Sequence, residues 1–229
     1  MSRTKIDDRR LPRYTKGEEI FNTVSHIVGG AFGIVVLLLC TIFAALGHNI
    51  RGLVSGIFYG IMMIFLYTMS SVYHGLKRSR AKKIMQVLDH CSIYAMILGT
   101  YAPVLATGMW DHSPKLTIII ACVVVIATAV GVTFTAIDFR KYKVISYASY
   151  FVIGWSMIFL IREVYRAFGG EFVAWLVIGG AIYTLGMIFF GLSAKNPVKH
   201  KYGHSVFHLF ILGGSIIQFI GIFKFCILR

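Results

Sequence analysis

The chain has 229 residues, of which 57% are hydrophobic and only 14% are charged. Soluble domains carry about 25% charged residues. The mean hydropathy of +0.76 is also strongly apolar. This composition excludes an ordinary soluble protein and predicts an integral membrane protein.

Seven long apolar runs follow one another along the chain, separated by short polar connections. Each approaches the length of about 20 residues that a helix needs to cross ~30 Å of hydrocarbon. Lipid offers no partner to backbone N–H and C=O groups, and the runs lack the period-two alternation of barrel strands, so helices are expected. We therefore predict an all-α, seven-helix transmembrane bundle with spans at about residues 20–46, 52–73, 84–108, 116–137, 144–161, 172–193 and 204–227. Residues 1–19 are predicted to form a basic tail and residues 20–229 a single transmembrane domain.

The net charge of +14 comes from basic residues whose positions indicate membrane orientation rather than nucleic-acid binding. Seventeen of the 23 Lys and Arg residues lie in the N-terminal tail and in the loops at 77–83, 138–143 and 194–203, which all face one side. The positive-inside rule therefore predicts a cytoplasmic N-terminus and an external C-terminus. The basic loops are interpreted as topology signals and lipid headgroup contacts, and no nucleic-acid partner is expected.

The start of the first span carries three polar residues on one helical face. Glu19, Asn22 and His26 are spaced by three and four residues, so their side chains point the same way. Two interpretations stay open: a network that orients metal-bound imidazoles through their second nitrogen, or a polar packing seam between helices. A cleaved signal peptide is a competing interpretation of this run, but the long apolar stretch fits a retained span better.

Ionisable residues inside the later spans are few, and the prominent ones share one depth. Ser70 and His74 end the second span, Asp89 lies near the start of the third, and His204 and His208 begin the seventh. Those helix ends all face the same side of the membrane. The five side chains are therefore expected within about two helical turns of one boundary, where they become functional-site candidates.

The histidine spacing predicts a metal site. His204 and His208 are four residues apart, so one helical face presents both imidazoles to a single ion. His74 would supply a third, leaving a fourth position open for water, which is typical of catalytic zinc. Asp89 could then accept a proton from that water. A lone membrane histidine is more often a hydrogen-bonded packing residue, and HxxxH pairs also arise by chance, but the shared depth favours zinc.

The remaining histidines and the cysteines receive simpler interpretations. His48, His112 and His200 fall in predicted loops and are interpreted as solvated surface. His90 is rotated about 100° from Asp89 around the helix, so it is expected to pack against a neighbour. All four cysteines lie in apolar runs without CxxC spacing and are interpreted as packing residues.

Several motifs together resemble one family. "SSVYH" at 70–74, "LDH" with Asp89 and "HSVFH" at 204–208 are similar to the SxxxH, D and HxxxH signatures of the progestin and adipoQ receptor family. "EEIFNTVSH" matches the ExxNxxxH element of that family, and the short tails resemble its bacterial hemolysin III branch. The resemblance implies a seven-helix protein of the bacterial inner membrane. It also implies zinc held by His74, His204 and His208, with Asp89 contacting the zinc-bound water and Ser70 in supporting contact.

Three functions remain open at this point. The wider superfamily includes alkaline ceramidases, so the resemblance implies a zinc-dependent hydrolase acting on the amide bonds of membrane lipids. The same zinc could instead hold together a lipid-sensing regulator without turnover. The name of the branch suggests a cytolytic pore, although the remaining spans lack the charged rings expected along an ion pathway.

Overall fold

The computed structural model describes residues 4–139, 141–196 and 198–229, and these residues form helices and connecting turns without any β-strand. Seven helical segments among them are long and apolar enough to cross a membrane, as predicted. The longer helices are α1 (Lys16–Leu46), α2 (Ile50–Gly75), α3 (Arg80–Val104), α5 (Pro114–Asp138), α6 (Lys143–Trp155), α8 (Gly170–Lys195) and α9 (Gly203–Ile222). The shorter elements are η1 (Ile6–Asp8), η2 (Leu105–Met109), α4 (Trp110–His112), η3 (Ser156–Leu160), α7 (Ile161–Phe168) and η4 (Phe223–Ile227).

Two spans extend beyond their predicted ends. The third continues from α3 through η2 and α4 to His112, and the fifth continues from α6 through η3 and α7 to Phe168. The prediction that His112 lies in a loop is therefore wrong, because His112 belongs to α4. Beyond the predicted end of the fifth span, Arg166 on α7 pairs with Glu163 one helical turn away at 3.2 Å. A hydropathy pattern places the end of a span where charged residues begin. A helix can continue past that point when its charged side chains have partners.

The first helix begins earlier than the apolar run indicates. Thr15 and Glu18 form a reciprocal capping box, in which the Thr15 hydroxyl accepts from the Glu18 N–H and the Glu18 carboxylate accepts from the Thr15 N–H. Helix α1 consequently starts at Lys16, inside the segment predicted to be a tail. This early start brings Glu18 and Glu19 into the helix.

Helices α1 and α2 pack at close range because each of them presents a glycine to the backbone of the other. A Cβ atom at Gly60 would lie 2.7 Å from the Cα atom of Leu37, and one at Gly33 would lie 3.1 Å from the backbone nitrogen of Ile64. Small residues at such contacts allow dispersion forces to hold helices together where lipid removes most of the hydrophobic driving force. The first helical pair is thereby fixed in register.

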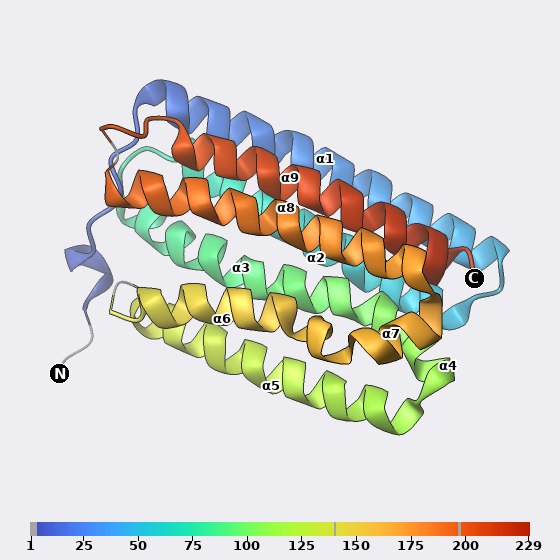
Figure 1. The fold of residues 1–229 in the computed structure, drawn as a ribbon. Helices are drawn as coiled ribbons and strands as arrows, with labels where there is room; N and C mark the ends of the chain where they lie inside the picture. The colour runs from blue at the N-terminus through green and yellow to red at the C-terminus, as the bar shows by residue number, and fades with distance from the viewer. Residues whose placement is uncertain (1–3, 140, 197) are drawn as a thin grey trace.

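The remaining helices complete an elongated bundle (Figure 1). Helix α3 packs along α2, α8 packs mainly against α9, and α9 returns to lie beside α1. Helices α5 and α6 lie on the opposite side of the bundle, and the two chain ends lie at opposite ends of it. Large apolar side chains remain exposed along the outer faces of the helices, as expected for surfaces in contact with lipid.

The orientation in the membrane stays a prediction with a direct test. Ser79 precedes α3 and Ser113 precedes α5, at the ends of one span. In a background with Cys40, Cys91, Cys122 and Cys226 replaced, we expect a cysteine at Ser113 to react with an impermeant thiol reagent on intact cells, and one at Ser79 to stay unlabelled until the cells are opened. Seventeen basic residues on the Ser79 side are the physical reason. The reverse labelling pattern would invert the topology.

Candidate metal centre

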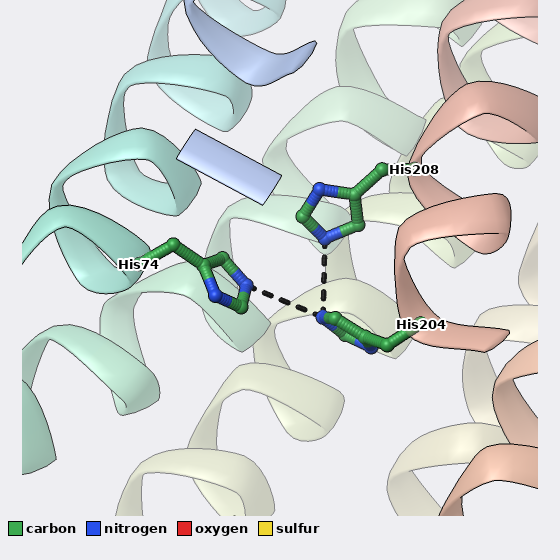
Figure 2. Close-up of side chains that lie close together, drawn as sticks. All are labelled: His74, His204 and His208. Carbon is green, nitrogen blue, oxygen red and sulfur yellow. Dashed lines mark hydrogen bonds between the residues drawn. The ribbon is translucent and has the colours of Figure 1, made fainter. Parts of the chain in front are cut away.

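Three buried imidazoles converge at the end of the bundle where α1 and α9 begin. The Nε2 atom of His204 lies 3.2 Å from Nε2 of His74 and 3.1 Å from Nε2 of His208 (Figure 2). The side chains come from the end of α2 and the start of α9 and are at most 7% exposed. Their ligand atoms are close enough together to hold one metal ion. The predicted common depth of these residues is therefore confirmed.

The start of α9 is positioned by α1. Helical spacing places His204 and His208 on one face of α9. Just before this helix, Tyr202 adopts a left-handed backbone conformation with φ of 60°. Its N–H donates to Oε1 of Glu18 at 3.0 Å. Glu18 thus stabilises the starts of both α1 and α9, which fixes the height of the two histidines relative to α1.

His74 is held by a partly buried network of polar side chains. Its Nδ1 atom donates to Oε2 of Glu19 at 2.8 Å, and the other Glu19 oxygen accepts from the Lys82 ammonium at 2.6 Å. Lys82 also donates to the backbone carbonyls of His74 and Leu76, which caps the end of α2. With its proton on Nδ1, His74 presents an unprotonated Nε2 to the other two histidines, which is the state that binds metals.

The donor set fits a tetrahedral metal ion. Zn–N bonds of about 2.0–2.1 Å at tetrahedral angles separate two ligand nitrogens by ~3.3 Å. The observed 3.1 and 3.2 Å separations are close to this value. Without a cation, the unprotonated Nε2 of His74 would face other ring nitrogens in a buried site. A shared metal ion satisfies all three nitrogens at once.

The polar face of α1 surrounds this cluster. Asn22 accepts a hydrogen bond from Ser205 at 2.7 Å, and its amide nitrogen lies 3.4 Å from Nδ1 of His74. His26 stacks on His208 with ring centroids 3.7 Å apart. Both predicted neighbours of the site therefore contact its histidines, and Glu19 does so through a hydrogen bond to Nδ1 of His74. The contacts agree with an orienting network.

Ser70 and Asp89 lie in the wall of an adjoining pocket. This cavity of about 200 Å³ is also lined by His204 and His208 and extends between α3, α6, α8 and α9. Nδ1 of His90 lies 3.8 Å from the Asp89 carboxylate and only 2.7 Å from the backbone carbonyl of Gln86, to which it donates a hydrogen bond. His90 also stacks on Phe139, as expected for a packing residue. The structure thus brings Ser70 and Asp89 to the pocket, and their catalytic roles stay predictions.

Two residues of the site escape recognition in the sequence. Lys82 belongs to the basic tract "KRSRAKK", yet it is 2% exposed and ion-paired with Glu19. Tyr14 belongs to the tail, yet its ring stacks on His204 at 5.0 Å and contacts His74 at 5.6 Å. Burial and the nearby Asp89 and Glu19 carboxylates raise the pKa of Tyr14 well above its usual range, so the phenol stays neutral. The tract's spacing gives no signal that separates Lys82 from its solvated neighbours.

The comparison with known proteins agrees with these motifs. The family profile described as "Haemolysin-III related" matches residues 14–219. The chain belongs to the haemolysin III family. This match confirms the predicted branch and covers the histidines, the carboxylates and the α1 network. No solved structure was found to match the chain.

Curated relatives of the haemolysin III family are similar over most of their length. The chain is 31% identical over 215 residues to the "Hemolysin-3 homolog" of Bacillus subtilis (strain 168), covering 93% of this chain and 97% of the relative. It is 32% identical over 219 residues to "Hemolysin-3" of Bacillus cereus, covering 96% and 94%. It is also 26% identical over 174 residues to the human "Monocyte to macrophage differentiation factor", covering 73% and 68%.

The histidine cluster predicts stable metal binding. Purified protein prepared without chelator should carry about one transition metal ion per chain, measured by elemental analysis. Replacing His208 with Ala removes one of three ligands and should release most of the metal. His112→Ala is the matched control because His112 pairs with Glu163 far from the cluster. Metal-free wild-type protein, or equal metal content in both variants, would contradict the assignment.

The Glu19 contact predicts a second, smaller effect on metal affinity. Glu19→Gln should weaken binding by about 10–100-fold, because the carboxylate that orients His74 and raises its basicity is lost. Competition with a chelator of known affinity would measure the change. Glu163→Gln, which removes the carboxylate from the exposed His112 pair, should leave the affinity unchanged. If both variants behave alike, Glu19 does not act through His74.

Proposed function

We propose that this haemolysin III protein is a zinc-dependent hydrolase that cleaves the amide bond of ceramide-like N-acyl lipids in the bacterial inner membrane. One observation carries the proposal: three buried imidazoles converge, and two of them, His204 and His208, line a largely apolar pocket whose wall also holds a carboxylate and a hydroxyl. Such an activity would serve membrane lipid homeostasis. With the basic loops inside, the site would lie near the cytoplasmic leaflet.

The choice of zinc rests on the donor set. Three neutral imidazoles without a thiolate or a carboxylate among the converging ligands match the three-histidine type of catalytic zinc site. Zn²⁺, when bound there, supplies a Lewis acid that polarises a carbonyl group and favours the ionisation of water. The protein's own contribution is to hold the His74 imidazole in one tautomer, through Glu19, and to keep bulk water away.

The pocket supports a lipid substrate. On α9 its lining runs from His204 to Gln218, which corresponds to ~21 Å of helix at 1.5 Å per residue. Aromatic and aliphatic side chains make up most of the wall between these two positions, including Phe207 and Ile211. A long acyl chain could lie along this depth with its amide group at the histidines. Apolar walls with a few convergent polar groups are typical of small-molecule sites.

Asp89 and Ser70 have complementary roles in the proposed reaction. The carboxylate of Asp89 would accept the proton of the attacking water and later pass it to the leaving amine. The hydroxyl of Ser70, one helical turn before His74, would donate a hydrogen bond to the oxygen of the carbonyl as negative charge develops there. Both side chains line the same pocket as His204 and His208, which is the arrangement that these roles require.

A metal-stapled regulator is the second candidate, and Tyr14 is the observation that favours it. The neutral ring of Tyr14 stacks on His204, so the segment before α1 covers the histidine cluster. The histidines themselves join α2 to α9, so a metal ion would also hold the bundle together. In that case occupancy of the pocket would change the packing of helices, and no lipid would be consumed.

Replacing Asp89 distinguishes the proposed hydrolase from the metal-stapled regulator. Asp89→Asn keeps the shape of the side chain but removes the base, so hydrolysis of an N-acyl lipid should fall by ~10²-fold or more. Lipid product release by purified protein is the measurement, with metal content determined in parallel. Metal should be retained, and Ser70→Ala should lose somewhat less activity.

Asp111→Asn is the matched control, because Asp111 pairs with Arg51 at the opposite end of the bundle. Two results would reject the hydrolase: wild-type protein that cleaves no N-acyl lipid across a broad panel, or an Asp89→Asn variant as active as wild type. If Asp89→Asn instead loses its metal, Asp89 belongs to the metal site and the regulator becomes the better description.

A further inference from the structure

A cleft lies between the N-terminal segment and the start of α3, separate from the histidine cluster. It has a volume of about 540 Å³ and is lined by residues 7–11, Arg13 and residues 78–80 and 83. Six of these are basic: Arg9, Arg10, Arg13, Arg78, Arg80 and Lys83. Only Asp7 and Asp8 are acidic, so the lining carries a formal charge of +4 (six minus two).

The acidic residues do not neutralise the cleft. Asp7 pairs with Arg80, with 3.3 Å between Oδ1 and Nε. Arg78 donates to the backbone carbonyls of Pro12 at 2.9 Å and Leu11 at 3.4 Å, and Lys83 donates to the carbonyl of Asp7. Carbonyl acceptors fix these side chains in place but leave their positive charge uncompensated. The cleft therefore concentrates positive potential on a framework that is already ordered.

Arg9 carries the strongest sign of a missing partner. The residue is 4% exposed, and only its Nη2 atom has an acceptor, the carbonyl of Ile137 at 2.8 Å. Its Nε and Nη1 atoms are buried without a hydrogen-bond partner among the described residues. The Asp138 carboxylate is near enough to interact with Arg9 electrostatically, but it forms no hydrogen bond with these two atoms. Burying a cation with unpaired donors is costly unless an anion compensates it. The planar guanidinium group of arginine can donate two parallel hydrogen bonds to the oxygens of a carboxylate or a phosphate.

The position of the cleft identifies where that anion could come from. Arg80 is the first residue of the third span, and Ile137 lies one residue before the end of the fourth, so the cleft lies at the boundary where the apolar helices end. Lipid headgroups occupy this level of a bilayer. Clusters of Lys and Arg beside span ends bind anionic lipid phosphates through charge-assisted hydrogen bonds.

We propose that this cleft is a phosphate-binding site that takes the headgroup phosphate of an anionic phospholipid, with Arg9, Arg10 and Arg13 as its principal contacts. Arg10 and Arg13 are exposed and follow the buried Arg9 on the same segment. The phosphate would lie between this segment and the start of α3. The site is independent of the metal centre and of any hydrolase activity, so each can fail without the other.

Lipid binding to the purified full-length protein tests the site. Native mass spectrometry would compare short-chain phosphatidylglycerol with phosphatidylcholine of the same chain length, and inorganic phosphate would be added as a competitor at matched ionic strength. Phosphatidylglycerol should bind about tenfold more tightly, the effect of one or two charge-assisted hydrogen bonds. The exposed double variant Arg10→Gln/Arg13→Gln should lose most of this preference, and Arg9→Gln should lose it as well.

Arg162→Gln is the matched control, since Arg162 is an exposed arginine on α7 at the other end of the bundle. Melting temperatures of all variants establish that they are folded, and the double variant keeps the test valid if Arg9→Gln unfolds. If inorganic phosphate binds with the same dependence on these arginines while the lipid does not, the site takes free phosphate. Equal binding of both lipids with no effect of phosphate or of the arginine variants would overturn the proposal.

Discussion

The histidine site depends on the Glu19 carboxylate, which accepts a hydrogen bond from His74 and forms an ion pair with Lys82. One carboxylate joins three helices, because Glu19 lies on α1, accepts from His74 on α2 and pairs with Lys82 on α3. Lys82 is buried, so removing the Glu19 carboxylate would leave its charge without a partner and away from water, which is costly. The arrangement therefore stabilises the three-helix contact only as a complete set. It also fixes the proton of His74 on Nδ1, which decides that Nε2 faces the other histidines.

The N-terminal segment links this network to the surface of the membrane. Residues before α1 run across the end of the bundle, where Arg9 donates to the end of α5 and the ring of Tyr14 reaches the histidines. The capping box of α1 and the bond from Tyr202 to Glu18 then place the starts of α1 and α9 at matching heights. A segment without long helical structure thus determines how the metal centre is covered.

Burial of polar groups explains why the site and the pocket occur together. Imidazoles, a carboxylate and a hydroxyl are costly in a lipid environment, and a protein retains them there when they bind or react. The pocket gives these groups a shared apolar space between α3, α6, α8 and α9, which the loose contact between α6 and α8 leaves open. The proposed hydrolase and the alternative regulator would both use this space, and they would differ in whether the Asp89 carboxylate exchanges a proton.

The sequence by itself determined the class of the fold, because seven apolar runs in a bilayer can satisfy their backbones only as helices. It also determined that His74, His204 and His208 share a depth, since helix parity and a spacing of four residues are properties of the chain alone. Only the tertiary structure decided which residues complete the site. Lys82 and Tyr14 lie in segments that read as solvated and basic, and nothing in their local spacing marks them. Their burial depends on how α3 and the N-terminal segment pack against α1 and α2. Contacts between distant segments produce no periodic pattern in the sequence.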